Sequence, residues 1–201
     1  MAGDRPLLQV IVGTTRPGRV GERIGRWITE RARTFEVFEV ELVDLAAVDL
    51  PFVDEAAHPA AQRYENGHTK EWSARVAAAD AFVFVTAEYN HGFSAPLKNA
   101  IDYLMYEWMY KPVGFVSYGG GVAGGTRAVQ MLKQVVVSLK MTPALEAVSI
   151  PFAHEVLGTA DPLDPNEVLD LAATDMLTEL SRLEAALRPL RAGVPGTPAG
   201  V

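Results

Sequence analysis

The residues best suited to chemistry lie between Thr86 and Asp102, a stretch that crowds polar and aromatic side chains into a turn. Tyr89 supplies a planar apolar face and a hydroxyl, and Asn90 supplies an amide. Gly92 lets the backbone approach a ligand closely. A flat heteroaromatic ring with carbonyls and nitrogens at its edge fits this set. Glu88 has a second interpretation, as a structural carboxylate that accepts hydrogen bonds from neighbouring backbone.

Residues 13–21 form a second candidate loop, rich in glycine, hydroxyls and arginine, that leads into a predicted helix. Backbone N–H groups and the positive helix end favour a phosphate there, and Arg16 can add a bidentate ionic contact. The pattern is neither the P-loop nor the Gly-x-Gly-x-x-Gly fingerprint. A glycine-bearing turn with a solvated arginine is therefore the alternative for this loop.

Residues 117–125 form the third loop, which contains five glycines. Its backbone N–H groups have few side chains in the way, so they can donate to ring carbonyls and stabilise negative charge. A flexible glycine loop without a ligand is the alternative. Three unusual loops carry more weight together than any one of them alone.

Elements that could position these loops follow from the apolar patterning. Short apolar runs predict five strands, at 7–12, 37–44, 81–85, 112–117 and 144–150, and helical spacing predicts helices at about 21–33, 69–79, 96–108, 126–139 and 166–190. Strands that alternate with helices predict an α/β fold, a flavodoxin-like doubly wound parallel sheet of order 2-1-3-4-5 with helices on both faces. The three loops then share the carboxyl edge of the sheet. Lys98 and Asp102, four residues apart on a helix, predict a surface ion pair.

The composition limits the classes of protein. A chain of 201 residues with 49% apolar residues and a net charge of −7 suits one globular domain, predicted over residues 1–191, and argues against a nucleic-acid surface. The chain has no cysteine, which excludes disulfides, thiolate metal ligands and a dithiol redox centre. His58, His68 and His154 show no metal-ligand spacing, so no metal site is expected. Residues 192–201 are predicted to be a disordered tail.

No apolar run reaches the length of a membrane span, and the first residues show no signal-peptide pattern. These features predict a cytoplasmic protein without a membrane partner.

The three loops together resemble the NAD(P)H-dependent FMN reductase family, which includes quinone, azo-dye and chromate reductases of flavodoxin-like fold. The resemblance spans roughly residues 7–150. Its most specific part is the Glu-Tyr-Asn string at 88–90 followed by Leu-Lys-Asn-Ala-Ile-Asp at 97–102; residues 13–18 and 117–120 complete it.

The resemblance implies FMN as cofactor and NADPH or NADH as electron donor. It assigns residues to three parts of the flavin: Thr14, Arg16, Arg19, Val20 and Gly21 to the phosphate, Ala87, Glu88, Tyr89, Asn90 and Gly92 to the isoalloxazine, and Ser117, Gly119 and Gly120 to the polar ring edge or the ribityl chain. Four positions depart from the family pattern, and one of them is His91, where relatives often have glycine or serine directly after the asparagine. Many members carry serine and asparagine where Arg19 and Gly21 stand, which implies more phosphate binding by backbone, and Ala87 replaces a common proline.

The implied mechanism needs no catalytic side chain, because the flavin carries the chemistry. A ping-pong cycle would pass a hydride from the nicotinamide to the flavin and then reduce a small-molecule acceptor such as another flavin or a quinone. Tyr89 and His91 would shape the acceptor pocket. His91 is either a proton donor or a solvated loop histidine.

Two other functions remain open at this point, a flavodoxin-type electron carrier and a non-redox module that binds a nucleotide or another phosphate ligand. Such carriers tend to be more acidic, with a phosphate loop that lacks arginine. Trp108, Tyr103, Tyr106 and Tyr110 form an aromatic cluster for which a subunit interface is favoured slightly over the core, because relatives often complete their flavin pocket with a second subunit. A homodimer or homotetramer is therefore expected.

Overall fold

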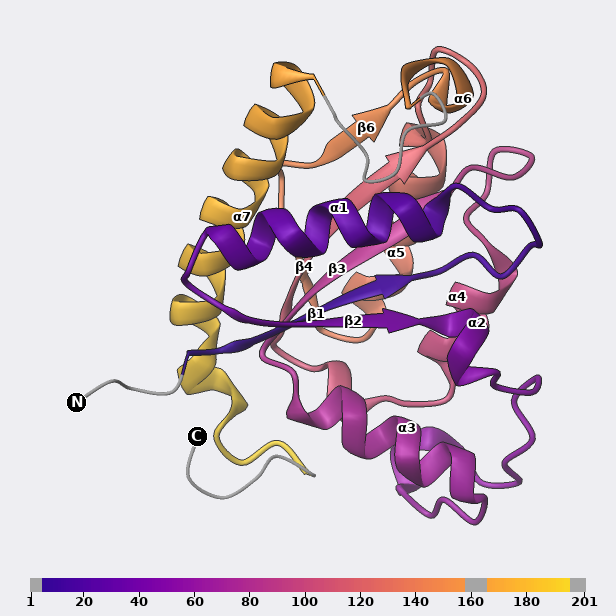
Figure 1. Cartoon of the computed structure of the whole chain (residues 1–201). Coiled ribbons are helices and arrows are strands. Elements are labelled where there is room, and N and C mark those ends of the chain that lie inside the picture. The colour runs from indigo at the N-terminus through magenta and orange to yellow at the C-terminus, as the bar shows by residue number, and fades with distance from the viewer. Residues whose placement is uncertain (1–4, 158–165, 196–201) are drawn as a thin grey trace.

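The computed structural model of the chain describes residues 5–157 and 166–195 (Figure 1). Residues 196–201 of the predicted tail lie outside the described residues. Among the residues described, no helix is long and apolar enough to cross a membrane, and no group of three metal-ligating side chains is found.

A parallel sheet forms the centre of the molecule. Its strands β2 (Glu39–Asp44), β1 (Leu7–Val12), β3 (Ala81–Ala87) and β4 (Pro112–Tyr118) lie side by side in that order. Every residue of β3 and β4 is buried, as continuous apolar runs in a two-sided sheet require. The predicted order 2-1-3-4-5 and the flavodoxin-like fold class are confirmed.

The fifth position of the sheet is shared by two short strands. The strand β5 (Thr142–Pro143) pairs with the start of β4, and β6 (Val148–Ile150) pairs with its end. Between them the Glu179 carboxylate accepts the backbone N–H groups of Leu145, at 3.3 Å, and Glu146, at 2.9 Å. The prediction of one strand over 144–150 is wrong because a side chain from a distant helix replaces the ladder there.

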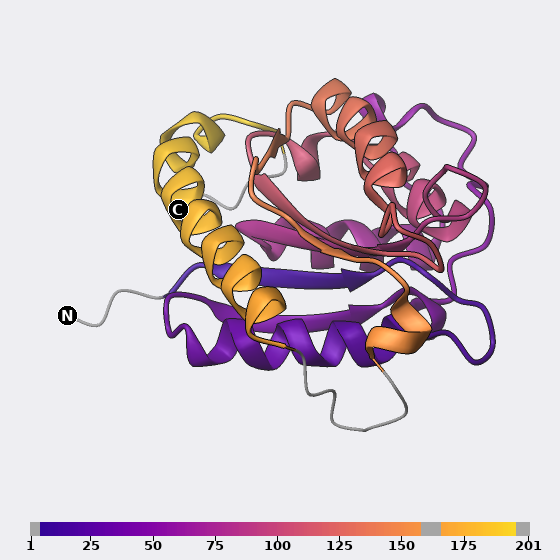
Figure 2. The same cartoon turned by 90° about the horizontal axis from the view of Figure 1, so that it is seen from above.

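Helices cover both faces of the sheet (Figure 2). One face packs against α1 (Gly21–Thr34) and α7 (Glu167–Leu187), and the other against α3 (Gly67–Ala78), α4 (Ala95–Asp102) and α5 (Thr126–Ser138). Each helix points an apolar stripe inward, as its 3.6-residue spacing predicts. Shorter elements complete the chain: α2 (Leu45–Val48), α6 (Ala153–Val156) and the 3-10 turns η1 (Pro59–Ala61), η2 (Tyr106–Trp108) and η3 (Arg188–Arg191).

The helix predicted for 96–108 is shorter in the structure, because α4 ends at Asp102. Two buried indoles bind its last carbonyls: Trp72 Nε1 donates to Ala100 O at 2.8 Å, and Trp108 Nε1 donates to Ile101 O at 3.1 Å. Carbonyls at a helix end lack intrahelical partners, so these two bonds compensate for the early end.

The aromatic cluster lies mainly in the core. Trp108 and Tyr103 are buried within the single chain, and the Trp108 ring lies 4.9 Å from the Phe82 ring between centroids. The interface interpretation is therefore wrong for these two side chains. Tyr106 and Tyr110 remain partly exposed.

Candidate functional site

The three predicted loops converge at the carboxyl edge of the sheet around a cavity of about 140 Å³. Segments far apart in the sequence line it: Arg16, Arg19, Val20, Ala87, Glu88, Tyr89, Tyr118, Gly119, Gly120, Ala153 and His154. Most of the predicted cofactor residues are among them. Thr14, Gly21, Asn90, Gly92 and Ser117 are not, and the structure gives each of these a different local role.

The first loop aims the start of α1 at this cavity. Gly13 N donates to Val85 O at 2.8 Å, and Arg19 N donates to Arg16 O at 3.1 Å across a turn with Gly18 at φ +70°. Val20, the residue before the helix, provides no side-chain cap. The first N–H groups of α1 therefore have no capping side chain, which suits an anion.

Thr14 and Gly21 shape the loop from behind. The hydroxyls of Thr14 and Tyr118 lie 3.0 Å apart, and both side chains are buried. A Cβ atom at Gly21 would lie 2.5 Å from each of these hydroxyl oxygens. A larger residue at position 21 would clash with the hydroxyls of Thr14 and Tyr118, so glycine is needed for α1 to begin this close to them. Burial raises the pKa of Tyr118 to about 12, so the phenol stays protonated.

The two arginines of the first loop differ in exposure and in ion pairing. Arg16 is exposed, and its side chain has no hydrogen bond or ion pair with the described residues. Arg19 is largely buried and ion-paired with Asp44, which also caps α2 by accepting Ala46 N at 3.0 Å. The buried Arg19 Nε has no partner. The positive charge of Arg16 is therefore not neutralised by a described side chain. The charge of Arg19 is neutralised by Asp44, and its Nε–H is left to donate a hydrogen bond.

The second loop is a tight turn. Tyr89 and Gly92 exchange backbone hydrogen bonds of 2.8 and 2.9 Å, and both central residues have positive φ, 51° at Asn90 and 70° at His91. This is the requirement of a type I′ turn, which asparagine and histidine tolerate better than most side chains. The turn leaves the Tyr89 side chain 40% exposed beside the cavity.

The Glu88 carboxylate faces α5. It accepts Arg127 N at 3.2 Å and Arg127 Nε at 2.7 Å, and the side chain is 8% exposed. Burial alone would raise the pKa of Glu88, but the hydrogen bonds and charge of Arg127 outweigh it and hold that pKa below its ordinary value. The structural interpretation of this carboxylate is confirmed, and the residue meets the cavity from the end of β3.

The third loop is held in place. The hydroxyls of Ser117 and Ser149 both donate to Gly124 O at 2.9 Å, and Gly119 N donates to Ile150 O at 3.2 Å. The hydroxyl of Ser117 and the N–H of Gly119 therefore serve the fold. Within residues 5–157 and 166–195, Gly120 N has no such partner, so its N–H is available at the cavity wall.

Sequence reasoning missed Tyr118, Ala153 and His154. Tyr118 stands inside the third predicted loop, and its place at the end of a strand was the signal that could have found it. The helix α6, which carries the other two, is four residues long and follows Phe152 at φ +46°. Helical periodicity cannot show in so short a segment.

Side chains of the Leu-Lys-Asn-Ala-Ile-Asp string at 97–102 stabilise the fold. Asn99 Nδ2 donates to Pro51 O at 2.6 Å, and Asn99 Oδ1 accepts Val53 N at 3.1 Å, so one side chain fastens the loop that follows α2. Lys98 and Asp102 form the predicted ion pair on the surface of α4.

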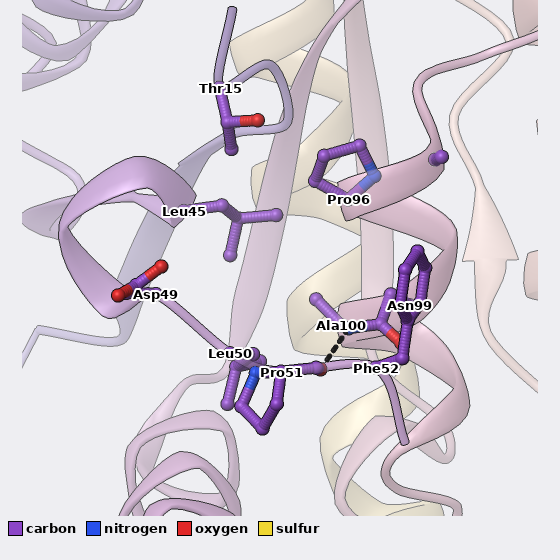
Figure 3. A pocket seen from close by; sticks show the side chains of 10 residues that line it. Thr15, Leu45, Asp49, Leu50, Pro51, Phe52, Pro96, Asn99 and Ala100 are labelled. Carbon is purple, nitrogen blue, oxygen red and sulfur yellow. Dashed lines mark hydrogen bonds between the residues drawn. The ribbon is translucent and has the colours of Figure 1, made fainter.

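A second, larger cavity of about 330 Å³ lies between this loop and α4 (Figure 3). Its lining is mostly apolar: Thr15, Leu45, Asp49, Leu50, Pro51, Phe52, Ala95, Pro96, Asn99 and Ala100. Thr15 lines this cavity and Arg16 lines the other, so the first loop runs between the two. Among the described residues that line it, Asp49 is the only charged one, and its carboxylate disfavours an anion. Of the two cavities, the smaller one has the lining that is better suited to an anion, because Arg16 and Arg19 line it.

Comparison with known proteins identifies the family of the chain. The sequence model of the family described as NADPH-dependent FMN reductase matches residues 6–155. An NAD(P)H-dependent FMN reductase of Schizosaccharomyces pombe is 40% identical over 161 residues, which is 78% of this chain and 80% of that protein. An NADPH azoreductase of Bacillus sp. is 34% identical over 62% of this chain and 65% of its own length.

A solved structure shares the fold. The flavoenzyme FerB, an NAD(P)H:(acceptor) oxidoreductase from Paracoccus denitrificans, superposes with a TM-score of 0.72 at 20% identity and covers 88% of this chain and 98% of its own. At that identity the likeness shows the fold, a doubly wound parallel sheet.

Proposed function

Because the chain belongs to the NADPH-dependent FMN reductase family, we propose that the cavity between its three loops holds the phosphate end of FMN. The protein is an oxidoreductase that uses FMN and NAD(P)H. The observation that carries the placement is the uncapped start of α1 beside the unpaired Arg16. Among the described residues around the cavity, only this part combines uncapped N–H donors with a cation that has no ion pair.

The phosphate would meet Arg16 and the first N–H groups of α1, at Gly21 and beyond. Arg19 would add its unpartnered Nε, and Val20 would cover one side. Thr14 would support the phosphate loop without contacting the phosphate, because its hydroxyl bonds to that of Tyr118 and does not line the cavity. These contacts agree with the expectation that backbone donors replace the serine and asparagine of many relatives.

The isoalloxazine would lie outside the phosphate cavity, because 140 Å³ is too small for the whole cofactor. It would rest against Tyr89 and the backbone of Ala87 and Glu88, with Gly120 N–H at its polar edge. Asn90 and Gly92 hold the turn that presents Tyr89, while Ser117 and Gly119 fix the third loop. When bound, FMN supplies the hydride chemistry; the protein orients it and leaves one face of the ring open.

The acceptor is proposed to be a flavin, a quinone or an azo compound that enters at the open ring face in a ping-pong cycle with NADPH or NADH. The azoreductase relative supports this class. The half-exposed Tyr89 and the exposed His91 stand at that mouth. Tyr89 would contact both the isoalloxazine and the acceptor, and His91 would contact the acceptor.

An anaerobic flavin spectrum tests the proposal. Purified protein, supplied with FMN, should show a bound-flavin spectrum that bleaches on addition of NADPH or NADH and recovers on addition of a quinone. Bleaching with recovery excludes the non-redox module, and rapid turnover excludes a pure electron carrier. A protein that stays colourless with excess FMN would overturn the proposal.

We also propose a homodimer or homotetramer and a cytoplasmic location, where reduced nicotinamide nucleotides are available. Exposed apolar side chains beside the site support the assembly: Val122 is 82% exposed and Phe152 is 42% exposed. Light scattering after size-exclusion chromatography tests the assembly, and cell fractionation tests the location.

A further inference from the structure

The short helix α6 brings a histidine to the phosphate end of the cavity. Ala153 N donates to Gly119 O at 2.9 Å, which ties the start of α6 to the third loop. Arg23 Nη2 of α1 donates to Leu157 O at 3.3 Å, which ties its end to the helix that follows the first loop. His154, directly after Ala153, therefore lines the cavity between these two anchors.

The turn before α6 fixes this placement. Phe152 has φ +46°, a conformation that bulky side chains rarely adopt. Its N–H donates to Gly121 O at 3.4 Å, and a Cβ atom at Gly124 would lie 3.0 Å from Pro151 N. Strained backbone persists only where its surroundings determine it. The third loop and α6 are thus packed closely enough to fix the backbone position of His154, whose side chain is exposed at the cavity.

The charge on the cavity wall leaves a phosphate incompletely neutralised. A phosphate monoester carries a charge of about −1.5 to −2 at pH 7. Arg16 supplies one positive charge, and the start of α1 supplies about half of one. Arg19 is cancelled by Asp44, and Glu88 by Arg127. Among the described residues that line the cavity, His154 is the remaining side chain that can carry a positive charge.

We propose that His154 is a further ligand of the FMN phosphate, and that it binds as the imidazolium, so that FMN affinity falls as the pH rises and the imidazole loses its proton. This inference rests on the proposed placement of FMN. The other charged or titratable groups toward this site are Arg16, Arg19 and Arg23 of the first loop and α1, Glu88 and Tyr89 of the second loop, Tyr118 of β4, and Glu155 of α6.

The test is a titration of the full-length protein with FMN, followed by flavin fluorescence, between pH 6 and pH 8.5. At pH 6 the His154→Gln variant should bind FMN about tenfold more weakly than the wild type, because it loses one charged hydrogen bond. At pH 8.5 the two proteins should bind alike. The His154→Lys variant keeps its charge and should bind tightly at both pH values.

Two controls identify the cause. Riboflavin lacks the phosphate and should bind the wild type and His154→Gln equally at every pH. The His58→Gln variant changes a histidine that does not line the cavity and should follow the wild type throughout. The inference is overturned if His154→Gln binds FMN as tightly as the wild type at pH 6, or if their affinity ratio is the same at all pH values. A wild type that binds no FMN refutes the proposed function itself.

Discussion

The two ends of the central sheet differ in whether their arginines are ion-paired. At the amino end, the largely buried Arg191 bonds to Asp80 at 3.0 Å and to Glu184 at 2.7 Å. At the carboxyl end, Arg16 and the first N–H groups of α1 are left open. Charges that are paired with one another fix the fold, whereas unpaired ones can bind a ligand. The second kind is found at the end that carries the proposed FMN site.

The amino end joins segments far apart in the chain. Asp80 also accepts Leu7 N at 2.8 Å, so Arg191 of η3 is linked to the start of β1. Nearby, Lys111 Nζ donates to Val76 O at 2.9 Å and to Ala77 O at 3.0 Å, at the end of α3. The charged groups in these contacts bond to one another or to backbone groups. They predict effects on stability without effects on FMN.

The largest effect is expected from Arg191→Met. Removal of one partner from a buried ion pair typically costs about 3–5 kcal/mol, because the other charges stay buried without it. The free energy of unfolding, measured by urea denaturation, should fall by about 3 kcal/mol or more, while FMN affinity per folded molecule stays unchanged. Arg182→Met, at an exposed position of α7, is the matched control. A loss of less than 1 kcal/mol would show that solvent screens the network.

A slightly smaller effect, on the pH dependence of stability, is expected from Lys111→Met. Burial, reinforced by the charge of Arg191, lowers the pKa of Lys111 to about 7, whereas an unfolded lysine titrates near about 10.4. Between these values the unfolded chain binds a proton that the folded chain does not, so wild-type stability falls as the pH drops from 10 to 7. Below pH 7 both states bind it, and the loss levels off.

The Lys111→Met variant should lack this component. The difference in unfolding free energy between wild type and variant should change by on the order of 3 kcal/mol between pH 10 and pH 7. Urea denaturation of both proteins at pH 7, 8.5 and 10 measures it. Parallel pH profiles would mean that Lys111 keeps its charge inside the folded protein.

At the carboxyl end the expected pattern is reversed. Arg16→Ala should weaken FMN binding by about tenfold to a hundredfold, because a charged hydrogen bond to the phosphate is lost. The unfolding free energy without FMN should change by less than about 0.5 kcal/mol, as at other exposed positions. Arg63→Ala removes another exposed arginine and should change neither quantity. Full FMN affinity in Arg16→Ala would place the phosphate elsewhere.

The sequence was sufficient to predict what depends on local patterning. Buried strands read as continuous apolar runs, and β1 has the predicted bounds. The first and third loops could be placed at one edge because parallel strands bring their carboxyl ends together. Contacts made by long side chains could not be predicted. The pairing of Arg19 with Asp44 and the capping of residues 145–146 by Glu179 depend on tertiary distances that no spacing encodes.

The smallest effect is expected at Glu88, a paired charge inside the open end. Glu88→Gln keeps the shape of the side chain and its backbone contacts but removes the charge that binds Arg127. Because the Arg127 side chain is 52% exposed, the pair should contribute less than about 1 kcal/mol to stability, and FMN affinity should change less than about threefold. Arg127→Met should produce the same small loss, and the double variant should add little to either one. A tenfold loss of FMN affinity in Glu88→Gln alone would mean that this carboxylate contacts the flavin. A paired charge would then bind the ligand, and the rule that paired charges serve the fold while unpaired charges bind FMN would be wrong for this residue.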